Sequence, residues 1–468
     1  MTDKKISTDV TRKIIEDFAR EISIKKRPGA KPEKEVIEFR NDRINGIERE
    51  VFYVPINILR FRKDNGRIAS DVMSHEKING RLDERLETTQ DIIRKFLKEK
   101  DEEKNIKLKN SILHSGQTEP AIITCDGFLI NGNRRKMVIE ELFNDNNIHD
   151  KHRFETMKVV ILPGEDSKGD GGPPTVKEIE QIENRYQLHS DGKAEYTNFD
   201  RAISIQRKIN AGMPLYEQLR DDPNYVRLTP KEFKKEIQKC QDEFLGPLKC
   251  VDNYLEQLDR QGLYDNISEG RTDREGRWQA FIDYHNTLYK PLRNEKTRIN
   301  DFGIEEDEVG EIEDIAFKII RKKDFPHIKT HEVIRKLSKI LKHKEAKKEI
   351  MKLKAVPHEL DNNDLNEDGD FRTFDKYWGK KHETVLVGKV IESIRIMEHT
   401  KELETPIELL NQALKKLNHE NMNPDGMDIL KSDEAWAKCK EIQQRAHELE
   451  KEFWEKRESI KKLKNKKW

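Results

Sequence analysis

The residues best suited to bind a ligand lie at positions 129–135, Leu-Ile-Asn-Gly-Asn-Arg-Arg, where two neighbouring arginines follow a glycine turn. Gly132 lets the backbone come close to a ligand, and the first amides of a helix beginning near Asn133 have no partners within that helix. Arg134 and Arg135 add forked, permanently charged donors that suit phosphate oxygens. The stretch therefore indicates a phosphate-binding turn.

The residues after this turn predict an amphipathic helix. Val138 and Leu142 stand four positions apart and give the helix a face to bury. The alternative to an anion site is a surface turn whose arginines pair with Glu140 or Glu141.

The elements around the turn predict a small α/β domain. The β-branched and aromatic run at 51–61 indicates a strand, and a charged helical insert follows at about 70–110. Two apolar runs around Asp-Gly within 120–130 predict a hairpin, because that pair tolerates positive φ. The run at 157–163 reads as another strand, and a Gly/Pro-rich loop closes the domain by residue 175.

Two further segments stand on either side of the turn: LKNSILHSGQTEP at 108–120 and IENRYQLHSDGKAEYTNFDRAISIQRKINAGM at 182–213. Together with GNRR they resemble, in order and spacing, the three boxes of the ParB/sulfiredoxin-like superfamily. VPINILRF resembles the first strand of that family, with a long insert before the first box. The resemblance covers about residues 50–213.

The resemblance implies a nucleotide site that takes CTP or ATP with Mg²⁺. It implies that nucleotide closes a dimeric clamp on DNA, and that slow hydrolysis reopens it. A carboxylate near the magnesium could hold the metal or orient water, so Glu183 is the candidate catalytic residue. The implied nucleotide-binding residues are Gly116, Gln117, Gly132, Asn133, Arg134, Arg135, Glu183 and Asn184.

The sequence departs from the family pattern at two positions. Asn133 stands where many ParB proteins have glutamate, and Gln187 stands where the arginine of the third box belongs, with Arg185 nearby. Both changes are compatible with binding and weaken the case for hydrolysis. The reactive cysteine of sulfiredoxin aligns with Asn133, and Cys125 lies in the preceding hairpin turn, so sulfiredoxin chemistry is not expected.

Beyond residue 176 the pattern is helical. Thr229 to Glu232 forms a capping box with proline in the first turn, which predicts a helix start. This helix and a second one from about Pro247 suggest a helix-turn-helix, although the CQDEFLG stretch between them is long for its turn. Outward-facing side chains could read bases or phosphates. The candidates are Lys249, Asn253 and Arg260. A plain helical bundle is the alternative.

Metal-binding patterns are weak. Residues 364–375, DLNEDGDFRTFD, approach a calcium loop, but Asp375 replaces the usual glutamate at the twelfth position. An acidic linker is the alternative interpretation. His327 and His331 are four apart beside a proline, which favours a solvated helix start, and no metal site is assigned.

Bulk composition limits the class of protein. Of 468 residues, 34% are hydrophobic and 38% are charged, which favours extended helical parts with thin cores. Net charge is zero, so composition alone does not favour nucleic acid, although five lysines lie in the last eight residues. No apolar run approaches the length of a membrane helix. Four scattered cysteines indicate reduced thiols, so we expect a cytoplasmic protein.

These observations predict an α+β chain: a small ParB/sulfiredoxin-like domain and a mostly helical C-terminal half. The expected parts are a helical, charged extension (1–50), the nucleotide-binding domain (51–175), a helical region (176–300), an acidic and helical linker (301–380) and a helical, coiled-coil-like association domain with a basic tail (381–468). The expected function is a nucleotide-dependent, DNA-binding homodimer. The alternatives are an enzyme of the same fold (a nuclease, NTPase or kinase) and a non-catalytic adaptor.

Overall fold

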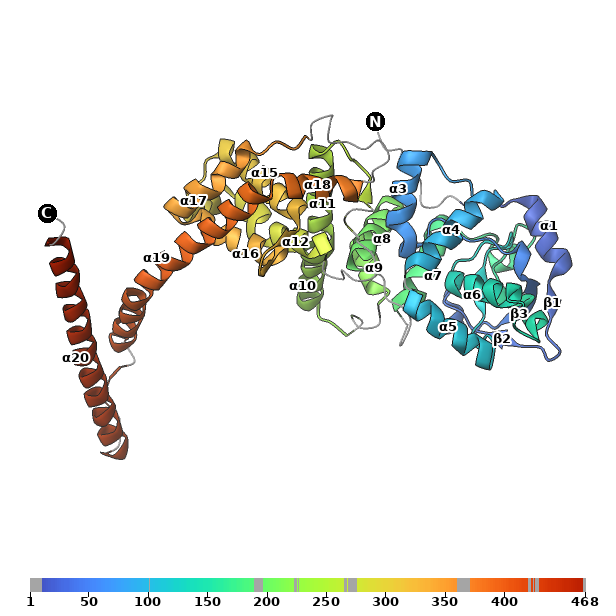
Figure 1. The fold of residues 1–468 in the computed structure, drawn as a ribbon. Helices are drawn as coiled ribbons and strands as arrows, with labels where there is room; N and C mark the ends of the chain where they lie inside the picture. The colour runs from blue at the N-terminus through green and yellow to red at the C-terminus, as the bar shows by residue number, and fades with distance from the viewer. Residues whose placement is uncertain are drawn as a thin grey trace. The chain divides into compact units, whose positions relative to one another are not determined.

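The chain is mixed α+β and mostly helical, as predicted, and its described residues form two sheets (Figure 1). The computed structural model describes residues 11–100, 102–188, 197–222, 225, 227–264, 267, 276–359, 371–419, 422–423, 425 and 429–465. The chain divides into two units, Met1–Met397 and Glu398–Trp468.

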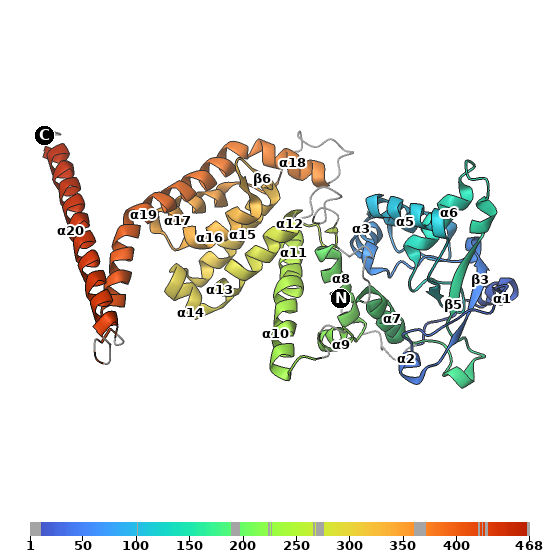
Figure 2. The same ribbon diagram turned by 90° about the horizontal axis from the view of Figure 1, so that it is seen from below.

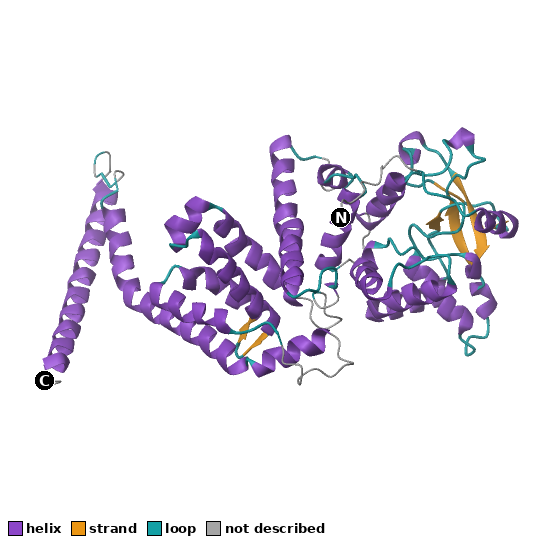
Figure 3. Cartoon of the chain, turned by 90° about the horizontal axis from the view of Figure 1, so that it is seen from above, coloured by secondary structure: helices purple, strands orange, loops and turns teal. Residues whose placement is uncertain are grey.

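The main sheet has five strands and belongs to the N-terminal domain, where the strands stand out in Figure 3. The strands are β1 (Arg27–Pro28), β2 (Lys34–Glu35), β3 (Arg49–Pro55), β4 (Ala121–Ile123) and β5 (Thr156–Ile161). Their order is β1-β3-β5-β4, with β2 also paired to β3. Only the β4–β5 pair is parallel among these described strands. The strands predicted near 51 and 157 are confirmed.

The turn predicted at Asp126–Gly127 is also confirmed. Gly127 has a φ of +85°, and the amide of Thr124 donates to the carbonyl of Phe128 at 2.9 Å. The arm that returns from the turn forms isolated bridges through Phe128 and Leu129. Asp126 is fully buried, and its carboxylate accepts two hydrogen bonds from Arg12 at 2.6 and 2.8 Å.

Helices cover both faces of this sheet (Figure 2). Successive strand residues point to opposite faces, so Val159 packs with one group of helices and Val160 with the other. The first face carries α6 (Asn133–Asn144) and α4 (Glu87–Lys100), and the second carries α7 (Val176–Leu188). The GNRR helix and the box-three helix therefore lie on opposite faces of one sheet.

The predicted insert at 70–110 consists of three helices, α3 (Ala69–Asn79), α4 and α5 (Glu102–Ser115). The charged extension contains α1 (Glu16–Lys25), and a short α2 follows (Asp42–Asn45). The first ten residues lie outside the described ranges.

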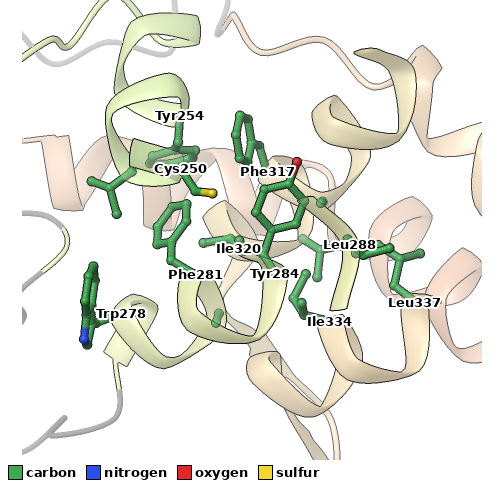
Figure 4. Close-up of a cluster of buried hydrophobic side chains, with 14 of the residues drawn as sticks. Cys250, Tyr254, Trp278, Phe281, Tyr284, Leu288, Phe317, Ile320, Ile334 and Leu337 are labelled. Carbon is green, nitrogen blue, oxygen red and sulfur yellow. The ribbon is translucent and has the colours of Figure 1, made fainter. Parts of the chain in front are cut away.

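The rest of the first unit is a helical assembly around one large apolar core. Aromatic side chains dominate it: the ring of Tyr254 lies 5.4 Å from that of Phe281 and 5.5 Å from that of Phe317 (Figure 4). Its helices are α8 (Asn198–Asn210), α9 (Leu215–Arg220), α10 (Pro230–Cys240), α11 (Gly246–Gln257), α12 (Gly276–Tyr284), α13 (Lys290–Arg293), α14 (Glu295–Thr297), α15 (Glu306–Lys322), α16 (Thr330–Leu341), α17 (Lys344–Ile350) and α18 (Phe371–Lys381), with a small hairpin of β6 (Asp324–Phe325) and β7 (Ile328–Lys329).

The helix-turn-helix prediction is wrong. The capping box of Thr229 and Glu232 starts α10 as expected, but α10 runs through a π-helical segment, Gln241–Leu245, directly into α11. A proline inside a helix lacks an N–H and clashes with the carbonyl one turn earlier. The wider π turn before Pro247 relieves that conflict without breaking the helix.

The second unit contains the end of α19 (Glu383–Leu417) and α20 (Ile429–Asn465). The start of α19 belongs to the first unit, because Leu386, Val390 and Ile394 are buried in its core. The division thus falls at 397/398, later than the expected boundary at 381. No helix within the described ranges is long and apolar enough to cross a membrane.

Candidate nucleotide-binding site

The glycine turn before α6 has the predicted form. Gly132 is the N-cap of α6 with a φ of +84°, and no side chain caps the helix there. A Cβ on Gly132 would lie 2.7 Å from the Cβ of Ala121, so both backbone conformation and space require glycine. The helix of twelve residues therefore begins with uncapped amides at the positive end of its dipole.

Arg135 folds back onto the loop that follows α5. Its Nη1 donates to the carbonyls of Glu119 and Pro120, the latter at 3.3 Å. Burial lowers the pKa of Arg135, although Glu119 opposes the effect. The hydrogen bonds of Arg135 in the described chain thus go to carbonyl oxygens rather than to a carboxylate.

Arg134 points elsewhere. Its Nε donates to the side chain of Asn105 on α5 at 2.8 Å. Asn133 is buried, and its Oδ1 has no hydrogen-bond partner among the described residues. A buried oxygen in this state is uncommon, because most buried polar atoms are satisfied.

The acidic residues proposed as alternative partners of the arginines have other partners. Glu140 pairs with Arg94 at 3.0 Å and with Lys136, while Glu141 lies 3.0 Å from Lys98. Burial lowers the pKa of Lys136 to about 8, with Glu140 opposing the shift. These contacts fix α6 against α4.

Gln117 holds the loop that receives Arg135. Its side-chain amide accepts from the backbone N–H of Lys158 at 2.8 Å and donates to the carbonyl of the same residue at 2.9 Å. Gly116, with a φ of +73°, turns the chain out of α5 into this loop. The structure therefore brings the first two boxes together. The carbonyls of Glu119 and Pro120 are contacts that the sequence reasoning missed, since backbone acceptors leave no residue signature.

Glu183 and Asn184 have a different set of partners. Oε1 of Glu183 accepts from the backbone N–H of Gly66 at 2.9 Å, and Oε2 accepts from Arg207 at 3.3 Å. The side chain of Asn184 accepts from Lys208 at 2.9 Å and donates to the carbonyl of Gln218 at 3.2 Å. These bonds tie α7 to α8 and to the loop at residue 66.

Glu180, one turn before Glu183, completes this buried network. Its carboxylate accepts from Arg62 at 3.1 Å and from Arg207 at 2.9 Å. Burial alone would raise the pKa of Glu183, but the charges of Arg207, Arg62 and Lys208 bring it below its ordinary value. We call Arg62, Glu180, Glu183, Asn184, Arg207 and Lys208 the α7 network. The i,i+3 pair of glutamates and the adjacent Arg207–Lys208 pair were the available sequence signals.

Arg185 and Gln187, the residues near the missing box-three arginine, also lie on α7. Arg185 pairs with Asp221 at 3.2 Å, so it joins α7 to the end of α9. The side chain of Gln187 lies outside the described part of the structure.

The cysteine near the site is not a reactive thiol. Burial, aided by Asp126, raises the pKa of Cys125 to about 11, so the thiolate is scarce at neutral pH.

The three candidate DNA-contacting residues differ in exposure. Lys249 is exposed on α11, whereas Asn253 is half-buried and donates to Glu313 at 3.4 Å. The outward orientation expected for Arg260 is wrong. Its side chain is buried, and its Nη1 donates to Asp375 at 2.9 Å. With no turn between α10 and α11, these side chains do not form a recognition helix of the predicted kind.

Asp375 itself is not available as a calcium ligand. It is buried among three guanidinium groups, those of Arg260, Arg277 and Arg321, each within 2.9 Å of a carboxylate oxygen. Most of the proposed calcium loop, residues 364–370, lies outside the described residues. Among the described residues, no group of three or more His, Cys, Asp or Glu side chains is arranged to hold a metal ion.

Comparison with known proteins gives no family assignment: no family model, no curated protein and no solved structure matches this chain. The chemistry of the site and the resemblance of its motifs therefore point to its function.

Proposed function

We propose that this chain is a ParB-like, nucleotide-dependent DNA-binding protein. In this proposal CTP or ATP with Mg²⁺ binds at the Gly132 turn, and the bound nucleotide closes one protomer on another around DNA. Support comes from the order of the three motifs and from the contact between the first two, where Gln117 holds the loop that receives Arg135.

The observation that carries the proposal is the environment of Arg135. Its guanidinium is partly buried and bonded to carbonyl oxygens, and burial lowers its pKa. Even partial burial of a charge is costly, and an incoming anion relieves that cost. Guanidinium groups match phosphate oxygens well, because they donate two parallel hydrogen bonds.

The start of α6 supports the same ligand. Gly132 provides no capping side chain, so the first amides of α6 remain donors for an outside oxygen. Helix N-termini of this kind bind phosphate groups through these amides and the helix dipole. Arg135 and the amides would therefore act on one phosphate chain from the same turn.

Magnesium fits this site less well than phosphate does. Mg²⁺ prefers oxygen ligands, usually one or two carboxylates together with the nucleotide phosphates. Both oxygens of Glu183 already accept hydrogen bonds, from Gly66 and Arg207. At the turn, the buried Oδ1 of Asn133 is the oxygen without a hydrogen-bond partner in the described chain. Any metal would then be held mainly by the nucleotide.

This assignment favours binding without efficient hydrolysis. A hydrolytic enzyme of this fold needs a carboxylate free to hold metal or orient water, and the α7 network already engages Glu183. A switch, or an adaptor that binds nucleotide without turnover, fits these contacts better than a nuclease, NTPase or kinase does. The DNA-binding part of the proposal rests on the resemblance, with Lys249 as the exposed candidate residue.

Binding of labelled CTP and ATP to the full chain tests the proposal, with and without Mg²⁺ and with and without DNA. We expect the wild type to bind at least one nucleotide and Arg135→Ala to lose most of the affinity. Arg81→Ala, which removes an exposed arginine of the same domain, should bind like wild type. Absence of nucleotide binding by the wild type contradicts the proposal. Rapid multiple turnover would favour the enzyme instead.

A further inference from the structure

Helix α20 carries a mostly apolar stripe that stays largely exposed within the second unit. Its members are spaced alternately by four and three residues over more than three heptads, which is the spacing of a coiled-coil seam. Ile442, Phe453 and Ile460 are 46%, 44% and 45% exposed. The stripe comprises Ala435, Cys439, Ile442, Ala446, Leu449, Phe453, Lys456 and Ile460.

The other helix of this unit does not bury the stripe. The C-terminal part of α19 has a seam of its own in Ile407, Leu410 and Leu414, which are 61%, 44% and 57% exposed. Helices in water owe most of their stability to packing of an apolar face, so a 37-residue helix with an open seam needs a cover.

We infer that the cover is α20 of a second copy of this chain, packed antiparallel as a two-helix coiled coil. The stripe is complementary to itself in that direction, because small side chains lie in its first half and large ones in its second. The core layers would pair Ala446 with Leu449, Ile442 with Phe453, Cys439 with Lys456 and Ala435 with Ile460, each from the opposite copy.

This register fills the core better than the parallel arrangement does. Well-packed cores alternate large and small side chains across facing positions. Two parallel copies in register would instead place Ala435 on Ala435, Ala446 on Ala446 and Lys456 on Lys456, leaving gaps and burying like charges. In the antiparallel register the ammonium of Lys456 lies beside the small Cys439 and can reach water along its flexible stem.

The residues that flank the seam agree with the same register. Arg445 of each copy would face Glu452 of the other, and Gln443 would face Glu450. A shift by one heptad would set Glu450 on Glu450 and Glu452 on Glu452, which is repulsive. In the structure Arg445 pairs with Glu448 and Glu452 of its own helix, all at least 49% exposed. Such exposed pairs are weak and are exchanged at little cost.

The inferred interface has closed two-fold symmetry, because each copy contributes the same surface. It makes the chain a dimer without nucleotide, and so it stands independently of the proposed nucleotide site. A dimer formed at α20 holds two copies of the N-terminal domain on one assembly.

Disulfide trapping in the full chain tests the orientation. Lys456→Cys should give a covalent dimer on mild oxidation, by bonding to Cys439 of the second copy. Cys439 is exposed, and so is Lys456, so the substitution leaves the fold intact. Lys451→Cys on the outer face of α20 should not give a covalent dimer, and neither should wild type.

The controls make each outcome decisive. Cys439→Ser/Lys456→Cys should lose the covalent dimer under the antiparallel register. A covalent dimer in that double variant, or in wild type through Cys439, overturns the inference in favour of a parallel pair. A monomeric wild type in light scattering also overturns it, as does a dimer that Lys456→Cys fails to trap.

Discussion

The Gly132 turn and the α7 network use basic side chains in opposite ways. In the network, Arg207 donates to two carboxylates, those of Glu180 and Glu183, so its charge is cancelled inside the protein. At the turn, Arg135 donates to carbonyl oxygens that carry no net charge. An arginine bonded to carboxylates holds elements together, whereas one bonded to carbonyls at a helix N-terminus is suited to an incoming anion. The family resemblance groups both sets of residues as one site, but their contacts separate them by role.

The largest expected effect comes from breaking the network. Glu183→Ala removes one carboxylate from the α7 network and leaves an excess of buried positive charge around Arg207. We expect this to lower the free energy of unfolding by about 3–5 kcal/mol. Urea denaturation measures the loss. Glu21→Ala, which removes an exposed i,i+4 pair with Lys25, should cost less than about 1 kcal/mol. A mild Glu183→Ala variant that loses nucleotide binding would instead make Glu183 a ligand-binding residue.

The next effect concerns the turn itself. Gly132→Ala meets both a positive φ and the Cβ of Ala121 at 2.7 Å, so we expect a loss of about 2–4 kcal/mol in unfolding free energy. Gly46→Ala provides a matched control, because its φ is +66° with nothing within 4 Å. That variant should lose only the conformational part, about 1–2 kcal/mol. Equal losses would show that close packing at Gly132 is unimportant.

Nucleotide affinity gives a third, smaller test of the contrast. Arg135→Ala should weaken binding about 10- to 150-fold, equivalent to about 1.5–3 kcal/mol for hydrogen bonds to a charged group. Arg135→Lys keeps the positive charge but not the forked pair of donors, so its nucleotide affinity should lie between those of wild type and Arg135→Ala. Isothermal titration of the folded variants measures this series. Unchanged affinity in Arg135→Ala would remove this residue from the proposed site.

The smallest effect is a change in acid stability. The folded pKa of Glu183 lies below its ordinary value of 4.5, because the basic charges of the network outweigh burial. Its contribution is therefore present above pH 4.5 and is lost as pH falls through the folded pKa. Glu183→Gln should flatten the decline of unfolding free energy below pH 4.5, by at most about 1.4 kcal/mol per pH unit. An unchanged acid profile would mean that the carboxylate is not held ionised by the network.

Local features were predictable because local chemistry decides them. The Asp126–Gly127 turn, the Gly132 N-cap and the Thr229 capping box all follow from residue types within four positions of one another. The helix-turn-helix failed for the opposite reason. Pro247 suggested a helix start, but a π turn in the preceding residues lets one helix continue through it.

Burial of charged residues could not be predicted in the same way. Arg260 has the sequence context of an exposed helix end, yet Asp375, 115 residues later, draws it into the core. Glu183 likewise meets Gly66 across 117 residues. Charge alone does not show whether a side chain will find its partner in solvent, in a ligand or in a distant segment.

Periodicity and neighbouring residues were enough to predict the pattern of strands and helices and the glycine turn with its arginines. The partners of the basic side chains, carboxylates for some and carbonyl oxygens for others, became clear only from the tertiary structure. Helices α6 and α7 lie on opposite faces of one sheet. Glu183 accepts a hydrogen bond from Arg207 in a buried network, whereas Arg135 donates to carbonyl oxygens. The physical reason is that the energy of a charged group depends on what surrounds it, and folding brings those surroundings from far along the chain.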